Sequence, residues 1–205
     1  MPEDSLIASR NLAGIALMTA GMASAAVVDA VIKAMSGLVD TFVITTVVGC
    51  GMALMFGIAT ITSGSRISQR DLVQRTVLFR TVCEVFGVYL IVLALSLVSL
   101  GEVTALSQTL PLLVTFGAVI FLGERAGPFE WIALFAGLIG MLLIVRPATD
   151  GFEPAILIAL ASAIVLAARD LASRAVPSSI STAQLGFWGG SALGVFSFAV
   201  VPQPI

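Results

Sequence analysis

The chain has 205 residues, of which 59% are hydrophobic and 11% are charged, and its mean hydropathy is +1.10. Soluble domains carry about 25% charged residues, and a soluble fold of this size has too little interior to bury so much apolar surface. The composition therefore excludes a soluble domain and predicts a membrane protein. With a net charge of −2 and no basic patch interleaved with aromatic residues, nucleic-acid binding has no support either.

Seven long apolar runs follow one another along the chain, and each reaches the length of about 17–25 residues that crosses a bilayer as a helix. Backbone polar groups in hydrocarbon must be paired within the segment, which excludes loops and open sheets. The fold class is therefore predicted to be all-α, a polytopic transmembrane helical bundle. The predicted spans are residues 12–34, 40–62, 76–98, 103–122, 129–146, 154–175 and 183–202.

The first run carries a charged pair near its end. Its start imitates a signal peptide, but the acids Glu3 and Asp4 and the continuing apolar character favour an uncleaved span. Asp29 and Lys33 lie one helical turn apart on one face. Because ionisable residues within a span are costly and tend to face a cavity or a partner, they are candidates for a gate or coupling pair. The alternative is that Lys33 extends to the outer interface and Asp29 neutralises it.

The third run contains a second pair at the same spacing, Arg80 and Glu84. Glu84 lies about one turn deeper in the membrane and is a candidate carboxylate in the path of a solute, where it could take part in proton coupling. The alternative is an intrahelical pair that holds Arg80 at the membrane interface.

The fourth run contains Pro111, which removes a backbone hydrogen bond and predicts a kink. Bent helices expose backbone carbonyls at transporter sites, and Gln108 and Thr109 beside the kink are candidate hydrogen-bonding partners for a solute. The alternative is that the kink only shapes the packing. At the end of this run, Glu124 and Arg125 are expected to cap or anchor the helix.

The sixth run repeats the charges of the first. Asp170 lies 141 residues after Asp29, and Arg174 lies 141 residues after Lys33, so the acid and the base recur at one offset. The second copy comes five helices later in the chain, so it enters the membrane in the opposite direction, as inverted repeats of secondary transporters do. By symmetry, Asp170 and Arg174 are candidates for the same gate or coupling role, whereas Arg169 is expected to be an interface anchor. Further pairs at this offset are Ile15 and Ile156, Ala20 and Ala161, Thr41 and Thr182, and Gly49 and Gly190.

Small residues line one face of the seventh run, at Gly186, Gly190 and Gly194, and one face of the first. Such faces let helices approach closely, here most simply within one copy of the chain. The alternative is self-association through a seam between two copies.

The orientation follows from the basic residues, which gather on the cytoplasmic side of membrane proteins. An N-terminus inside the cell places eight of the ten basic residues at cytoplasmic positions, and the expected location is the inner (cytoplasmic) membrane. The eight residues are Arg10, Arg66, Arg70, Arg75, Arg80, Arg125, Arg169 and Arg174, whereas Lys33 and Arg146 fall outside.

The order of motifs from the fourth run onward resembles the drug/metabolite transporter superfamily, EamA type. Its elements are Gln-Thr-Leu-Pro-Leu at 108–112, Phe-Leu-Gly-Glu-Arg at 121–125 and the glycine-spaced helix at 137–144. The resemblance implies two inverted five-helix units and a small-molecule solute as partner, with no dedicated cofactor or metal. Residues 1–147 would be the first unit and residues 148–205 two helices of a second, so three helices of the usual ten are expected to be lacking.

These observations predict a secondary active transporter that moves a small metabolite or drug across the membrane by alternating access. Enzyme chemistry is disfavoured, because the chain has no histidine for a metal or a base and no glycine-rich phosphate loop. The alternative is a non-transporting protein, either a truncated relic or a membrane subunit that needs a partner.

Overall fold

The computed structural model describes residues 2–64, 73–125, 127–145 and 154–200, and for residues 2–11, 13, 144 and 145 it describes the backbone only. The regular structure of these residues is helical, as predicted, and most helix ends lie within a few residues of the expected ones. The helices are α1 (Pro2–Met35), α2 (Thr41–Thr62), α4 (Arg75–Leu97), α5 (Leu100–Ser107), α6 (Leu110–Phe121), α7 (Pro128–Val145), α8 (Ile156–Arg174) and α9 (Thr182–Val200).

Six candidate membrane spans have the length and apolar character of a crossing helix, with α5 and α6 together forming one of them. The fifth predicted span, residues 129–146, corresponds to α7, which is apolar, but its fully described part, residues 128–143, is shorter than the six candidate spans. The expected residues Arg66, Arg70 and Arg146, and the expected unit boundary at 147/148, lie outside the described residues.

The fourth predicted span is interrupted, as the proline within it predicts. α5 ends at Ser107, and α6 begins at Leu110 with Pro111 in its first turn. A proline ring clashes with the carbonyl of the residue four positions earlier, here Ser107, but is tolerated in the first turn of a helix. The break therefore falls at Gln108 and Thr109, just before the proline rather than at it.

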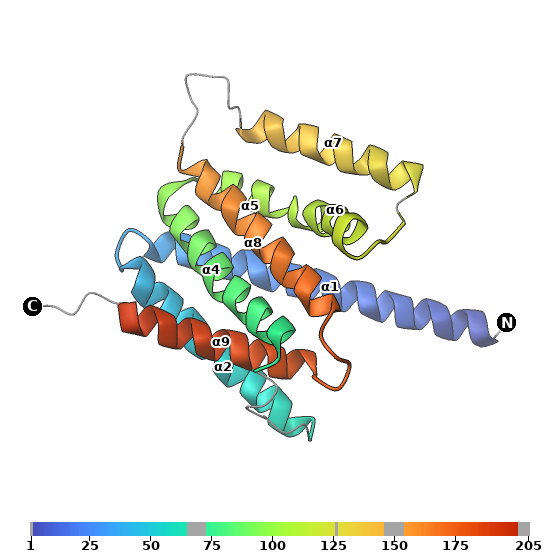
Figure 1. Ribbon diagram of the computed structural model, residues 1–205, viewed down its shortest axis with the longest axis horizontal. Coiled ribbons are helices and arrows are strands. Elements are labelled where there is room, and N and C mark those ends of the chain that lie inside the picture. Colours follow the sequence, from blue (N-terminus) through green and yellow to red (C-terminus); the bar gives the residue numbers. More distant parts are fainter. Residues whose placement is uncertain (1, 65–72, 126, 146–153, 201–205) are drawn as a thin grey trace, which may run out of the picture.

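The helices surround α4, which packs against α8 on one side and α9 on another. α2 lies along α9, and α8 also contacts α5 and α6, with α7 beyond them at the edge of the bundle (Figure 1). α1 contacts α4 and α5 near its C-terminal end, and its N-terminal half extends away from the other helices (Figure 1).

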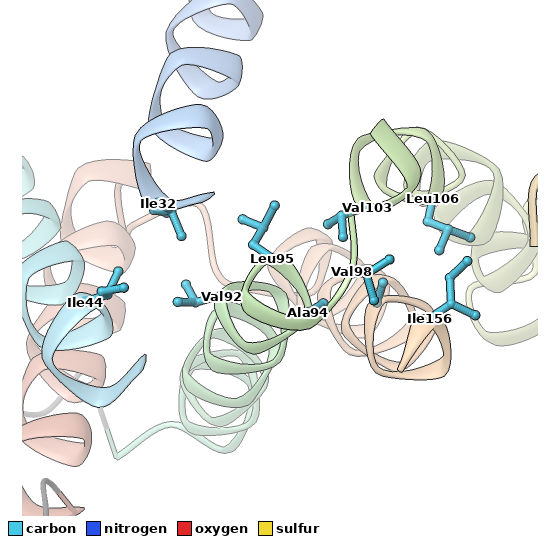
Figure 2. Packing of buried hydrophobic residues seen from close by; sticks show 10 residues of the cluster. Ile32, Ile44, Val92, Ala94, Leu95, Val98, Val103, Leu106 and Ile156 are labelled. Carbon is cyan, nitrogen blue, oxygen red and sulfur yellow. The ribbon is translucent and has the colours of Figure 1, made fainter. Parts of the chain in front are cut away.

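The largest apolar cluster lies where α1 and α4 end and α8 begins (Figure 2). Ile32 of α1 and Ile44 of α2 pack there with Val92 and Leu95 of α4, and Ile156 of α8 belongs to the same cluster. We call this the Ile32 end of the bundle. The opposite end, where α4 begins and α8 ends, is called the Arg75 end.

Glycines bring α2 and α9 into backbone contact, which confirms the prediction that the small-residue face of the last run packs closely. A side chain on Gly49 would collide with the backbone of Gly194 and with the carbonyl oxygen of Gly190, 2.9 Å away. Gly186 lies against the ring of Phe56 in the same way. In contrast, the small residues of α1, such as Ala16 and Ala20, are exposed.

Candidate functional site

Four charged side chains meet between α4 and α8 near the Arg75 end. Glu84 accepts a hydrogen bond of 3.0 Å from Nη1 of Arg169 through its Oε1 atom, and its Oε2 atom lies 3.1 Å from Nη2 of Arg80. Arg169 also reaches Asp170, with 2.7 Å between its Nη2 atom and Oδ1. The result is one chain of ion pairs, Arg80–Glu84–Arg169–Asp170, which we call the charge cluster.

Neighbouring groups from α8 and α9 complete the cluster. The Nε atom of Arg80 donates to the hydroxyl of Ser173 (3.0 Å), and its Nη1 atom donates to the carbonyl oxygen of Leu185 (3.1 Å). Gly189 leaves the space that Glu84 occupies, because a methyl group there would lie 3.0 Å from the Glu84 side chain. Gly189 of α9 thus faces the Glu84 side chain of α4, and its lack of a side chain makes room for the carboxylate.

Burial makes this arrangement costly unless every charge is compensated. Glu84 is 2% exposed and Arg80 is 8% exposed, whereas Arg169 and Asp170 are partly accessible. Two cations and two anions balance, which removes the net charge but not the cost of desolvating each group. The Oε2 atom of Glu84 has no hydrogen bond of good geometry within the described part of the chain. Buried polar groups are rarely left so, and this oxygen can accept a further hydrogen-bond donor.

The predicted residue Glu84 lies at the centre of this cluster, and Arg80 pairs with it as the spacing predicts. Arg169 differs from expectation, since it bridges two acids instead of only anchoring the helix at the interface. Asp170 pairs with Arg169 rather than with Arg174, which forms an exposed 2.9 Å ion pair with Glu124 at the end of α6.

Asp29 and Lys33 are not paired with each other in the described part of the chain. The ammonium of Lys33 instead donates two hydrogen bonds of 2.7 Å to the carbonyl oxygens of Leu95 and Val98. The last carbonyls of a helix have no partners of their own and attract a cation, and these at the end of α4 hold Lys33. Asp29 is half-buried on α1.

The three candidates in the interrupted span have local roles. Thr109 is 4% exposed, and its hydroxyl donates to the carbonyl oxygen of Leu106 (2.7 Å). Gln108 directly follows the end of α5 and is exposed, as is Pro111. Among the described contacts, none joins these residues to the charge cluster.

A cavity of about 460 Å³, open on one side, lies between α4 and α9, and none of the four residues of the charge cluster lines it. Three aromatic residues, Phe86, Trp188 and Phe196, contribute to its lining, and the rings of Phe86 and Phe196 are 5.8 Å apart. Thr81 and Trp188 also line it, but the hydroxyl oxygen of Thr81 and the indole nitrogen of Trp188 are themselves buried and have no hydrogen-bond partner in the described part of the chain. The cavity volume lies within the range of small-molecule sites, about 300–1,000 Å³.

Sequence reasoning missed the bridging role of Arg169 and the contributions of Ser173 and Gly189. Arg169 and Ser173 lie four residues apart, so they share a face of α8. That spacing carries a signal only once α8 is known to pack on α4. Gly189 was not singled out, because the predicted small-residue face comprised Gly186, Gly190 and Gly194, and Gly189 does not share their spacing of four.

Comparison with known proteins places these observations in a family. The model of the EamA-like transporter family matches residues 12–146. The chain is 36% identical over 99 residues to a riboflavin transporter of Rhizobium johnstonii, a match that covers 48% of this chain and 33% of that protein. It is 34% identical over 95 residues to a riboflavin transporter of Vibrio cholerae (46% and 32%).

A third relative is an S-adenosylmethionine uptake transporter of Rickettsia felis, 27% identical over 118 residues, covering 58% of this chain and 40% of that protein. The chain thus spans well under half the length of the curated relatives it matches. No solved structure matches. The family match covers well over half of the chain, so it belongs to the EamA-like transporter family of the drug/metabolite transporter superfamily, a family of transporters and not of enzymes.

Proposed function

We propose that the chain is a secondary active transporter, or the greater part of one, that moves a small metabolite across the inner membrane by alternating access. The charge cluster is the observation that carries this proposal. Ionisable residues inside membrane spans are costly and typically mark the path of a solute or ion. Here a carboxylate that is 2% exposed sits between two guanidinium groups from different helices.

The cluster would act by exchanging partners. Glu84 is held by Arg80 on its own helix and by Arg169 on α8, so protonation or solute binding at Glu84 would weaken the link between α4 and α8. The two helices could then shift relative to each other, which is the kind of motion that alternating access requires. In this scheme Asp170 keeps Arg169 paired while Glu84 is neutral.

The solute is proposed to be a flat heteroaromatic metabolite similar to riboflavin. Two of the relatives are riboflavin transporters, and the cavity between α4 and α9 is lined by Phe86, Trp188 and Phe196. Aromatic side chains stack on flat rings. Gln108, Thr109 and Pro111 would shape the path at the interrupted span.

We further propose that residues 1–147 and 148–205 belong to two inverted units, with the N-terminus in the cytoplasm. Residues related by the offset of 141, Gly49 and Gly190, lie against each other between α2 and α9. Residues near a two-fold axis contact their own counterparts, so this contact supports the repeat. Reporter fusions after residues 37 and 178 should report opposite sides of the membrane. Reports from the same side would contradict the inverted arrangement.

The alternative, a membrane subunit that needs a partner, is favoured by one observation. Only 6% of the apolar window of α1 is buried, against 50% for α4. A helix packed so little within its own chain could be covered by another chain. Co-purification of a second polytopic protein, together with absence of uptake by the chain alone, would favour this reading.

The test of the transport proposal is uptake of radiolabelled riboflavin by proteoliposomes that contain the purified chain. Its sharpest variant is the double substitution Arg80→Met with Glu84→Leu. Replacing a buried ion pair by apolar residues of similar volume is often neutral for stability, and Arg169 keeps its pair with Asp170. We expect a folded protein whose uptake falls to background.

A matched control is the double substitution Glu124→Gln with Arg174→Gln, which removes an exposed ion pair at the same end of the bundle. Uptake by this control should stay near the wild-type rate. Wild-type uptake by the Arg80/Glu84 double variant would show that the cluster is only structural. Absence of riboflavin uptake by every form, with uptake of another labelled metabolite, would reject the proposed substrate class alone.

A further inference from the structure

A second cavity opens near the Arg75 end, between α4, α6 and α8, and has a volume of about 500 Å³. Apolar side chains from three helices line it, among them Phe79, Phe121 and Leu171. Ala168 and Ala172 of α8 also line the cavity, and larger side chains at these two positions would fill it. The charge cluster does not contribute to its lining.

The cavity lies at the ends of three candidate spans, where a bilayer would meet water. α4 begins at Arg75, α6 ends at Phe121 and α8 ends at Arg174, so the lining includes the last turns of three candidate spans. From there it extends inward to Phe79 and Ala168, more than one helical turn from these ends. A molecule in this cavity would have one part at the headgroup level and the rest among hydrocarbon.

The mouth of the cavity carries a positive charge that no acid of the described residues pairs with. Arg75 is exposed and lines the cavity, and it has no ion-pair partner among the residues that the structure describes. Two acids lie close in sequence to lining residues, and both are already paired: Glu124 with Arg174, and Asp170 with Arg169. A guanidinium group binds phosphate oxygens with two parallel hydrogen bonds.

The geometry points to a binding site for one anionic phospholipid, with its phosphate at Arg75 and an acyl chain in the apolar cavity. The fit rests on two features together: a cation at the headgroup level and an apolar cavity that continues from it into the membrane. Basic pockets between membrane helices bind lipid head groups for the same reason. This site is separate from the proposed path of the solute, which passes the charge cluster and the cavity between α4 and α9.

The test is a lipid titration of the purified chain in detergent, followed by native mass spectrometry. The probes are phosphatidylglycerol, phosphatidylcholine with the same acyl chains, and inorganic phosphate. One arginine near the membrane surface contributes an affinity difference of about fivefold. We therefore expect Arg75→Gln to weaken phosphatidylglycerol binding about fivefold and to leave phosphatidylcholine binding unchanged.

Arg125→Gln is the matched control, because Arg125 is an exposed arginine at the same end but does not line the cavity. It should leave both lipids unaffected. Ala172→Phe, which fills the cavity, should weaken both. Both arginines are exposed, so these two variants are expected to fold even if Ala172→Phe does not.

Several results would overturn the site. Equal losses in Arg75→Gln and Arg125→Gln would mean that lipid binds by diffuse surface charge. Unchanged affinity in Arg75→Gln would mean that no headgroup contact exists there. Displacement of the lipid by inorganic phosphate alone would indicate a plain anion site, and displacement by riboflavin would assign the cavity to the solute.

Discussion

α1 and α4 are both apolar enough to cross a membrane, yet they are held in opposite ways. Half of the apolar window of α4 is buried within the chain, and its charges, Arg80 and Glu84, are paired with groups from other helices. For α1 the buried share is 6%, and its contacts gather at its C-terminal end, where Lys33 reaches α4 (Figure 1). One helix is embedded in protein, whereas the other is held mainly at one end.

The difference shows what charge does in each setting. In α4 the charges lie between helices, where two guanidinium groups surround one carboxylate and tie α4 to α8. In α1 the lysine satisfies the terminal carbonyls of α4, which no residue of α4 can satisfy itself. The first arrangement depends on desolvated electrostatics and the second on helix-end hydrogen bonding, so substitutions should separate them.

The largest effect is expected at Glu84. Glu84→Gln removes the anion between Arg80 and Arg169, and leaving a buried charge without its partner costs about 3–5 kcal/mol of stability. The measurement is the free energy of unfolding of the purified chain in mixed micelles. Glu124→Gln, which breaks the exposed pair with Arg174, should cost only about 0–1 kcal/mol. Similar losses in the two variants would mean that the charge cluster is solvated rather than buried.

The next effect is expected at Lys33. Lys33→Met removes both hydrogen bonds to the end of α4, and a hydrogen bond to a charged group contributes about 1.5–3 kcal/mol. Hydrogen exchange should increase at the C-terminal turns of α1 and α4 while the middle of α4 stays protected. Lys33→Arg keeps a cation with several donors and should restore most of the protection. Unchanged exchange in Lys33→Met would show that α1 is held by Ile32 and its apolar neighbours instead.

The contact between α2 and α9 offers a smaller effect without any charge. A methyl group in Gly190→Ala would lie 2.5 Å from the backbone nitrogen of Ala53, and overpacking of this kind costs about 1–3 kcal/mol. Gly51→Ala, on the same α2 helix but with open space around it, should be neutral or stabilising by up to about 1 kcal/mol. Equal unfolding free energies for the two variants would mean that α2 and α9 separate easily in the membrane.

These regions also differ in how far the sequence could predict them. The helices were predictable because apolar length alone determines a membrane span, and Pro111 revealed the interruption between α5 and α6. Glu84 was found because a carboxylate in an apolar run is conspicuous. Its partner Arg169 was not assigned to it, because the contact depends on how α4 packs against α8, and no spacing within one helix encodes that packing.

The contacts of Lys33 could not be predicted from the sequence for the same reason, because they depend on how the helices pack. Its spacing from Asp29 predicts an intrahelical pair, but a free helix end nearby is a better partner than an acid one turn away, and only the fold brings that end close. The sequence shows which residues are costly in a membrane. Which helix compensates that cost is a property of the tertiary structure.

Asp29 of α1 contrasts most clearly with Glu84 of α4, which is paired with two arginines. The smallest effect on stability is expected at Asp29. It is half-buried and has no ion-pair partner among the described residues. Asp29→Asn should therefore change the unfolding free energy by no more than about 0.5 kcal/mol.

An acid inside a span costs about 2.5–3.5 kcal/mol on insertion, so a structural role would require a compensating partner. Asp29 has no such partner in the described part of the chain, so the transport proposal predicts that riboflavin uptake by Asp29→Asn falls although the fold is unchanged. A clear loss of stability in this variant would instead reveal that α1 is covered by a partner that Asp29 contacts. Wild-type uptake with wild-type stability would remove Asp29 from the transport path and leave Glu84 as its only proposed carboxylate on α1 and α4.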